Sequence, residues 1–278
     1  MNNFSIPLSE VVNKAFDEIV PSITPITNTI SRNLATIIDK FEGYLLILPP
    51  WIMIIVVGAL VGFFLNKKLG IFTIASLTFL LGLELWSQTM STLSLVLTGT
   101  IISLLIGIPL GILSSQSDVT ERVLRPILDF MQTLPSFVYL IPAVMFFGLG
   151  KVSSLVAVLI FSMPPAVRLT NLGIRQVPKD MVEAARAFGS TRLQILLGVQ
   201  LPLALSTIMA GVNQCIMMAL SMSVIAAMIG GGGLGRDILR AMQTVDIGLG
   251  VESGIAIVLL AILLDRITEN IAKSKNNI

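Results

Sequence analysis

Long apolar runs, almost free of charged residues, recur along most of this chain. A helix needs about 20 such residues to cross the roughly 30 Å hydrocarbon core of a bilayer. Runs near that length predict about seven membrane-spanning helices, at residues 43–65, 69–86, 92–113, 130–150, 152–167, 203–229 and 247–264. The last of these is the weakest, since it contains Glu252. No repeat period is visible. The pattern predicts an all-α membrane protein.

The first 42 residues have an amphipathic pattern instead. One apolar stripe begins at Leu8 and continues through Phe16, and a second, weaker stripe runs from Ile30 to Phe41. This periodicity predicts two amphipathic helices that lie on a membrane face or against the other helices. Their polar positions are acidic rather than lysine-rich, so binding to anionic lipid is not favoured. No basic region precedes an apolar one, which argues against a signal peptide.

Composition agrees with a membrane protein and removes several classes of function. The 278 residues are 54% hydrophobic and 12% charged, with a mean hydropathy of +0.91, whereas soluble proteins carry about 25% charged residues. A net charge of +2 gives no reason to expect nucleic acid as a partner. The chain has no histidine and one cysteine, Cys215. We therefore expect no catalytic residues, no metal site and no intramolecular disulfide.

Basic residues set the expected orientation, because loops on the cytoplasmic side carry an excess of Lys and Arg. If segment 168–202 is cytoplasmic, seven spans leave the N-terminus outside and the C-terminus inside. Six basic residues then lie outside, namely Lys14, Arg32, Lys40, Lys151, Arg236 and Arg240. The other twelve lie inside, namely Lys67, Lys68, Arg122, Arg125, Arg168, Arg175, Lys179, Arg186, Arg192, Arg266, Lys273 and Lys275.

The longest inner segment contains a short amphipathic stretch, residues 183–202. Helical spacing gives it one narrow apolar stripe, formed by Met181, Ala184, Ala185 and Phe188. Gly189 follows as a residue that tolerates the left-handed conformation in which helices end. Ser190 can cap a second short helix, which Pro202 is expected to stop. Periodicity alone is equally compatible with a helix that simply lies on the membrane.

The spacing of this stretch resembles the EAA signature of ABC importer permeases. That signature reads Glu-Ala-Ala, three residues, Gly, nine residues, then Ile-x-Leu-Pro. The chain matches it at Glu183, Ala184, Ala185, Gly189, Leu201 and Pro202, and departs from it at Val199. In that family the helix is the coupling helix, held in a cleft of the ATP-binding subunit. The resemblance implies an ATPase-coupling role for the six matching residues and for Phe188.

Further segments are similar to glycine betaine/proline betaine permeases of this class. They are QTLPSFVYLIP at 132–142, MIGGGGLG at 228–235, DIGLGVESG at 246–254 and ILLDRIT at 262–268. The resemblance covers about residues 85–268, and more loosely the amphipathic tail and the first two spans. It implies a type I (MetI-like) importer permease that carries a quaternary-ammonium osmoprotectant.

The same resemblance implies a domain organisation and a set of partners. The implied parts are an extracytoplasmic tail at 1–42, two peripheral spans at 43–90, a five-helix core at 91–268 containing the coupling loop 168–202, and a cytoplasmic tail at 269–278. The implied partners are a second copy of the chain, two ATP-binding subunits that hold ATP and Mg, a separate extracytoplasmic substrate-binding protein, and membrane lipid. The chain itself is expected to bind no cofactor, in a bacterial or archaeal plasma membrane.

A glycine run follows the sixth expected span, with glycines at Gly230, Gly231, Gly232, Gly233 and Gly235. It satisfies G-x-G-x-x-G, but a dinucleotide fingerprint must follow a strand and open a helix of a βαβ unit. It also approaches a phosphate-binding loop, but Arg236-Asp237 replaces the required lysine and hydroxyl residue. We expect instead a tight bend that leads into a short helix near 236–243. As a group the glycines are candidates for an outer gate or a receptor-docking surface; for each one, an ordinary helix C-cap is the alternative.

Aromatic residues supply weaker candidates for the transport path, because quaternary ammonium groups bind aromatic faces. The candidates are Pro135, Phe137, Tyr139 and Phe161, with Phe146 and Phe147 beside them. Packing or lipid contact is the alternative role.

Two alternative functions are open at this point. One is an ABC permease for another small solute such as choline, carnitine or an amino acid. The other is an ion-coupled secondary transporter, which is less favoured because only Glu252 lies within an expected span. A gated channel has no need of a docking helix of the EAA type.

Overall fold

The computed structural model describes residues 8–275, and within that part of the chain every regular element is a helix. The prediction of an all-α protein is confirmed. The elements in chain order are α1 (Leu8–Ile47), α2 (Pro50–Phe64), α3 (Lys67–Gly82), α4 (Trp86–Gln116), α5 (Asp118–Thr133), η1 (Ser136–Tyr139), α6 (Leu140–Phe147), α7 (Lys151–Arg175), α8 (Lys179–Ala187), α9 (Arg192–Ile195), η2 (Leu196–Gln200), α10 (Leu201–Ala226), η3 (Ala227–Ile229), α11 (Gly233–Thr244) and α12 (Ile247–Lys275).

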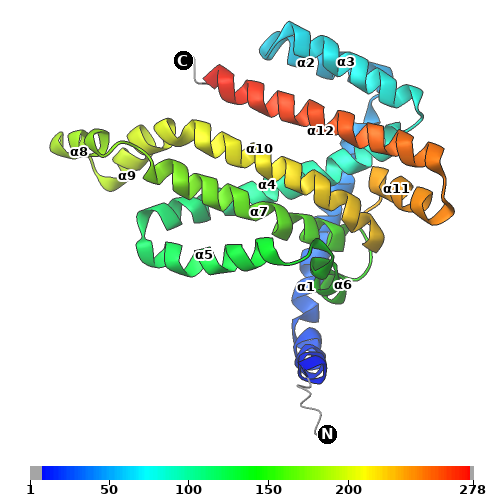
Figure 1. Ribbon diagram of the computed structural model, residues 1–278, viewed down its shortest axis with the longest axis horizontal. Coiled ribbons are helices and arrows are strands. Elements are labelled where there is room, and N and C mark those ends of the chain that lie inside the picture. The colour runs from blue at the N-terminus through cyan, green and yellow to red at the C-terminus, as the bar shows by residue number, and fades with distance from the viewer. Residues whose placement is uncertain (1–7, 276–278) are drawn as a thin grey trace, which may run out of the picture.

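Helices α4, α7 and α10 form the centre of the molecule and run side by side along its long axis (Figure 1). Three glycines of α4, Gly99, Gly107 and Gly111, face α7 at close range. A Cβ atom added at these glycines would lie 2.8, 2.9 and 2.6 Å from side-chain atoms of Val158, Ala166 and Thr170. Small residues at a helix interface let two backbones approach closely, which is how helices associate in a bilayer. Glycine at these positions therefore allows the short distance between α4 and α7.

Small hydroxyl side chains add polar contacts within this core. The Ser103 hydroxyl of α4 lies 3.0 Å from the Ser162 hydroxyl of α7 and donates to the Leu159 carbonyl at 3.1 Å. A polar group inside a bilayer needs such partners, since no water is there to replace them. The thiol of Cys215 on α10 is also in this interior, and that residue is fully buried.

Within the described residues, four helices are long and apolar enough to cross a membrane: Trp86–Gln116, Lys151–Arg175, Arg192–Ile229 and Ile247–Ala272. Two bent helix pairs raise that number to six if each pair is a single span. The expected seven is not confirmed, because α2 and α3 have 15 and 16 residues. At about 1.5 Å per residue, each is shorter than the roughly 30 Å hydrocarbon core.

Two expected spans are broken rather than straight. The run 43–65 is divided by a 95° bend between α1 and α2, and the run 130–150 by a 106° bend between α5 and the η1–α6 segment. An exposed proline stands at each break, Pro49 and Pro135. Proline removes a backbone donor and holds the preceding residue out of the helical region, so both breaks fall where a helix is easiest to end.

The expectation that the fifth span ends at residue 167, just after Pro164 and Pro165, is wrong. Helix α7 includes both prolines and continues to Arg175. Both are buried against the neighbouring helices, so tertiary packing maintains the helix through them. The loop that follows therefore begins at Gln176 instead of residue 168.

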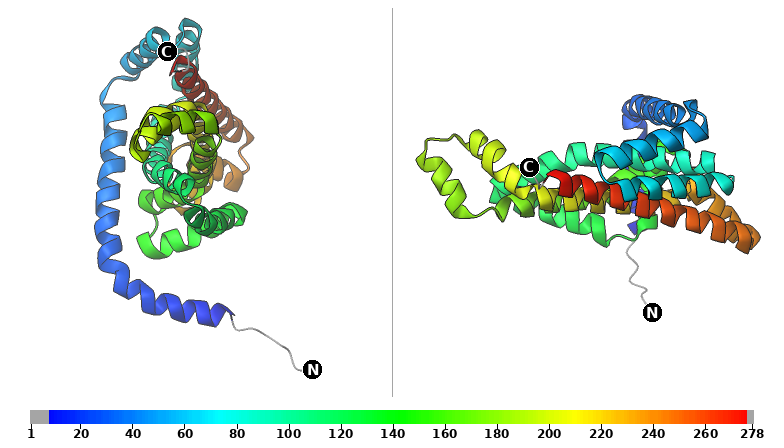
Figure 2. Two further views of the ribbon diagram at one scale, coloured as in Figure 1. Left: turned by 90° about the vertical axis from the view of Figure 1, so that its left-hand side faces the viewer. Right: turned by 90° about the horizontal axis from the view of Figure 1, so that it is seen from above.

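The N-terminal segment forms one long helix, where two were expected. Helix α1 passes through Pro21 and Pro25 and lies across the core helices (Figure 2). Its C-terminal half is attached to the start of α7, where the Lys151 ammonium lies 2.7 Å from Glu42 and 3.1 Å from Asp39. Residues 1–7 and 276–278, the outermost parts of the two expected tails, lie outside the described residues.

Helices α2 and α3 form a peripheral hairpin beside α12 (Figures 1 and 2). Their contact uses Gly58, Gly62 and Gly70. A Cβ atom at Gly70 would lie 2.6 Å from the Gly62 Cα and 2.8 Å from the Gly58 carbonyl oxygen. The hairpin therefore depends on direct backbone contact.

Candidate functional site

The two groups of candidate residues lie at opposite ends of the core helices. The loop that connects α7 to α10, residues 176–200, projects at one end and carries α8 and α9 (Figure 1). The glycine turn, residues 230–235, lies at the other end, where it leads into α11 (Figure 1). One group therefore cannot contact the other directly.

The end of α8 has the conformation that its glycine predicts. Gly189 has a φ of +80°, in the left-handed region. Its N–H donates to the Arg186 carbonyl at 2.9 Å, and the Ser190 N–H donates to the Ala185 carbonyl at 3.1 Å. This pair of bonds is the Schellman motif, which satisfies the last carbonyls of a helix. It fixes the direction in which the chain leaves α8.

The cap of the following helix lies one residue later than expected. Thr191, rather than Ser190, caps α9: its hydroxyl accepts from the Gln194 N–H, and the Gln194 side chain accepts from the Thr191 N–H. This reciprocal capping box satisfies two backbone donors at once, which a serine cap at 190 would not achieve with the same partner.

Helix α8 is covered only in part by the rest of the chain: Val182 packs against a buried cluster of the core, and Ala185 is half-buried. None of its residues, 179–187, is buried. Most of its expected apolar stripe is uncovered, with Met181 49% and Phe188 91% exposed, and Glu183 and Ala184 are exposed beside them. Large apolar side chains that are left uncovered in this way mark an interaction surface.

The other end of the motif has a different environment. Leu201 packs into a cluster with Ile174, Val177 and Ile208 at the base of the loop. Pro202 does not stop the helix, as was expected, but lies in the first turn of α10, where a missing N–H costs least. The turn before it, Leu196–Gln200, is a π-helix. Leu201 therefore anchors the loop, whereas Pro202 is exposed beside it. Residues 183–189 form the outer surface of the loop.

The glycine turn is tightly packed, and the expected short helix is α11. Gly230, Gly232 and Gly233 have φ values of +96°, +74° and +63°. The Leu234 N–H donates to the Thr92 hydroxyl at 2.8 Å, and a Cβ atom at Gly233 would lie 2.3 Å from that hydroxyl.

The remaining glycines of the turn are close to other segments as well. Gly231 and Gly235 are buried, and a Cβ atom on either would lie 2.9 Å from its nearest neighbour. The Gly150 N–H donates to the Ile229 carbonyl at 2.8 Å, which ties the turn to the start of α7. The turn therefore packs against α4 and the start of α7 at this end of the bundle.

The aromatic candidates do not converge on one cavity. Tyr139 is buried, lies edge-on to Phe161 with 6.1 Å between ring centroids, and donates from its hydroxyl to the Met131 carbonyl. This environment is that of a packing residue. Phe137 is 54% exposed, and Pro135 is exposed at the break after α5. Phe146, Phe147 and Phe161 are half-buried, so Phe137 and Pro135 are the most exposed of the candidates.

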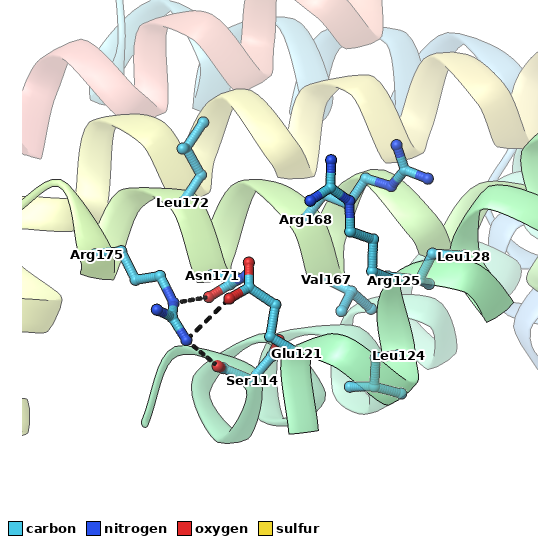
Figure 3. Close-up of a pocket in the computed structure, with 10 residues that line it drawn as sticks. All are labelled: Ser114, Glu121, Leu124, Arg125, Leu128, Val167, Arg168, Asn171, Leu172 and Arg175. Carbon is cyan, nitrogen blue, oxygen red and sulfur yellow. Dashed lines mark hydrogen bonds and ion pairs between the residues drawn. The ribbon is translucent and has the colours of Figure 1, made fainter. Parts of the chain in front are cut away.

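A cavity of about 250 Å³ lies between α5 and α7, next to the loop (Figure 3). Its lining residues are Ser114, Glu121, Leu124, Arg125, Leu128, Val167, Arg168, Asn171, Leu172 and Arg175. From the sequence, the arginines of this set indicate only the expected orientation of the chain. The pairing of Arg175 with residues some 60 positions away has no local sequence signal.

Within residues 8–275, no group of three or more His, Cys, Asp or Glu side chains is arranged so that together they could bind a metal ion. The absence of a metal site stays a prediction for the chain as a whole.

Comparison with known proteins assigns this architecture to a family. Residues 103–276 match the family model described as binding-protein-dependent transport system inner membrane component. The glycine betaine transport system permease protein OpuAB of Bacillus subtilis is 45% identical over 98% of this chain and 96% of its own length. The glycine betaine/carnitine transport permease protein GbuB of Listeria monocytogenes is 48% identical over 95% of each chain.

A third relative and a solved structure agree with these matches. The glycine betaine/proline betaine transport system permease protein ProW of Escherichia coli is 44% identical over 98% of this chain and 77% of its own length. A chain from an inward-facing structure of the MetNI methionine ABC transporter superposes with a TM-score of 0.63, at 21% identity, over 69% of this chain and 95% of that one. At that identity the likeness shows the fold alone, which is the MetI-like fold.

Proposed function

Because this chain belongs to the family of binding-protein-dependent transport system inner membrane components, we propose that it is the membrane-spanning subunit of an ATP-driven importer for glycine betaine or proline betaine. The proposed substrate class rests on one observation: the chain is 44–48% identical, over nearly its whole length, to permeases named for these solutes. Carnitine is the second candidate, since one of those relatives is named for it too.

The loop between α7 and α10 supplies the coupling step in this proposal. Glu183, Ala184, Ala185, Phe188 and Gly189 dock in a cleft of a separate ATP-binding subunit, which holds ATP and Mg. Exposure of the apolar stripe of α8 supports this role, because burial of a large apolar side chain stabilises a docked complex. ATP binding then moves α8 as a rigid body, and Leu201 and Pro202 pass the movement to α10.

The glycine turn is the outer gate in the same scheme. Its close contacts with Thr92 and Gly150 seal one end of the bundle, and rearrangement of Gly230 to Gly235 opens it toward the binding protein. Phe137 and Pro135 border the path below the gate. The complete assembly contains two copies of this chain, two ATPase subunits and one separate binding protein, and the path lies between the two copies.

Transport in proteoliposomes tests the function. The chain is co-expressed with its ATPase, purified and reconstituted, and uptake of labelled glycine betaine is measured with binding protein outside and ATP inside. We expect uptake that requires ATP, continues when ion gradients are collapsed, and is inhibited by excess proline betaine. Uptake that follows an ion gradient without ATP would show a secondary transporter. Stronger inhibition by carnitine, choline or an amino acid than by betaines would reassign the substrate.

Native mass spectrometry of the detergent-solubilised complex tests the assembly. We expect a mass that corresponds to two copies of this chain and two ATPase subunits. A complex that contains one copy of this chain would contradict the proposed path between two copies.

A further inference from the structure

One guanidinium joins three helices at the point where the chain enters the coupling loop. Arg175, at the end of α7, donates from Nη2 to the Ser114 carbonyl at 3.1 Å and lies 3.0 Å from Glu121 (Figure 3). The same nitrogen donates to Asp118 at 2.8 Å. Its Nε donates to the Asn171 side-chain oxygen at 3.0 Å, and the Asn171 amide donates to Glu121 at 3.2 Å. We call these five residues the elbow cluster. It links the end of α4, the start of α5 and the end of α7.

The return end of the loop contacts the same place. Gln200, the last residue before α10, accepts a hydrogen bond at 3.2 Å from the Gln116 amide at the end of α4. Gln116 lies two residues after Ser114 of the elbow cluster. Both ends of the loop are therefore bonded to the short α4–α5 junction, residues 114–121. The contacts between the loop ends and this junction are made by polar side chains.

Helix α5 is held to the core at this junction and, further along, by Leu128 and the Arg168–Asp129 ion pair. Leu128 is its one buried residue within 118–133, whereas α7 is buried along most of its length. At its other end α5 meets the 106° break before η1, and the segment beyond the break is anchored by buried Tyr139 and Leu140. An element with few buried apolar contacts opens and moves more easily than one in the core. The break provides a hinge, and the elbow cluster holds the opposite end.

We propose that Arg175 is a positioning residue that transmits movement of the coupling loop to α5. When α8 moves with the ATPase, Arg175 moves the start of α5, and α5 turns about the Leu134–Pro135 break toward the segment that contains Phe137. The role rests on the proposed function, because it requires that a partner moves the loop. Single exposed ion pairs are weak, but a planar guanidinium offers five fixed donors and here meets four acceptor groups. A lysine ammonium is a single point charge and cannot reproduce this arrangement.

The number of ATP molecules hydrolysed per solute imported by the reconstituted complex is the first test. For Arg175→Gln we expect ATP hydrolysis to be retained and uptake to fall, so that this ratio rises roughly tenfold, within the range of typical coupling energies. Arg175→Lys should give an intermediate ratio. Arg168→Gln is the matched control: Arg168 also pairs α7 with α5, through Asp129, but no described contact joins it to α4 or the loop. Its ratio should stay at the wild-type value.

Equal losses of hydrolysis and uptake in Arg175→Gln, or an equal rise of the ratio in Arg168→Gln, would show that Arg175 has only a structural role. If Arg175→Gln does not assemble, Glu121→Gln is the second variant. It leaves Arg175 bonded to Ser114 and Asp118, and the ratio should rise less but measurably; an unchanged ratio would overturn the proposal.

A distance measurement tests the role of Arg175 independently of which solute the importer carries. Spin labels are placed at Val123 on α5 and Met145 on α6, both exposed, in the complex with and without ATP. We expect a nucleotide-dependent change of this distance in the otherwise wild-type protein, and its loss in Arg175→Gln. A change that persists in Arg175→Gln would overturn the role of Arg175, even if the importer carries another solute. Failure of the wild type to import betaine, with the distance change present and dependent on Arg175, would contradict only the proposed substrate.

Discussion

Phe188 is the residue whose exposure is hardest to explain within a single chain. It is 91% exposed at the end of α8. If it docks in an ATPase cleft, Phe188→Ser removes most of the apolar contact, at a cost of about 2 kcal/mol. That corresponds to a roughly 30-fold rise in the Kd for the ATPase subunit, measurable by titration of the solubilised permease. Leu149→Ser is the control, since Leu149 is also exposed (77%) but lies between α6 and α7, away from the loop. Similar losses in both variants would contradict the docking role.

Two neighbouring residues of the glycine turn allow the cost of backbone strain to be compared with the cost of a steric clash. Gly232 and Gly233 both have positive φ values, +74° and +63°, so alanine at either is strained by roughly 1–3 kcal/mol. At Gly232 the nearest atom, in Ser91, would lie 3.6 Å from the new Cβ, whereas at Gly233 the Thr92 hydroxyl would lie at 2.3 Å. Overpacking typically costs a further 1–3 kcal/mol, roughly. Gly233→Ala should therefore lower the Tm of the purified protein clearly more than Gly232→Ala. Equal Tm values would indicate that the turn is not packed as the structure shows.

Val245 offers a stabilising change. It ends α11 with a φ of +56°, although a β-branched residue disfavours that conformation, and it is 81% exposed. Val245→Gly should remove about 1 kcal/mol of strain while losing little packing, and raise the Tm. Val251→Gly, at an exposed position inside α12, is the control and should lower it. A lower Tm for both would mean that Val245 is held in place by a contact with a partner chain.

At the scale of elements, the close contact between α2 and α3 predicts that a small substitution at Gly70 separates the two helices. Gly70→Ala would place a Cβ atom 2.6 Å from the Gly62 Cα, where two backbones would have to separate. Gly82→Ala, in the same helix, meets nothing within 4 Å. We expect Gly70→Ala to expose the hairpin to protease in membrane vesicles, with a cost of about 1–3 kcal/mol, and Gly82→Ala to be neutral or slightly stabilising. Protection in both variants would contradict direct backbone contact.

The positions of helices could be predicted from apolar runs, but their breaks could not. Long apolar runs predicted the positions of α4, α7, α10 and α12, because the length needed to cross a bilayer is a strong constraint. Prolines then had opposite effects: the exposed Pro49 and Pro135 stand at breaks, whereas the buried Pro164 and Pro165 lie inside α7. Burial between α4 and α10 decides the difference, and burial is a property of the fold rather than of the local sequence.

For the candidate sites too, local features could be predicted from the sequence and contacts between distant segments could not. The conformation of Gly189 could be predicted because a helix end of that kind is a local event. The elbow cluster could not, since Arg175 meets partners on two other helices that are distant in the sequence. Tyr139 packs on Phe161, and the prediction that these residues border the path stays a prediction. An aromatic side chain gives the same sequence signal in either role.

For the whole molecule, the orientation in the membrane stays a prediction, and it is directly testable. Charge counting places the loop 176–200 inside and the glycine turn outside. The attachment of α1 to Lys151, beside the glycine turn, is consistent with an N-terminus on the outer side. A periplasmic reporter phosphatase fused at the N-terminus should be active, and a fluorescent protein that matures only in the cytoplasm should fluoresce at the C-terminus. The reverse pattern would invert the gate and the coupling loop.

The burial of Cys215 has a practical consequence for the study of this transporter. The chain contains one cysteine, which is fully buried within α10, and a thiol reagent reacts with the exposed thiolate form. The unmodified protein should therefore remain unlabelled by maleimides in the folded state. A cysteine introduced at α8, the glycine turn or α5 can then be modified selectively without removal of the native residue, and labelling of Cys215 itself would report unfolding.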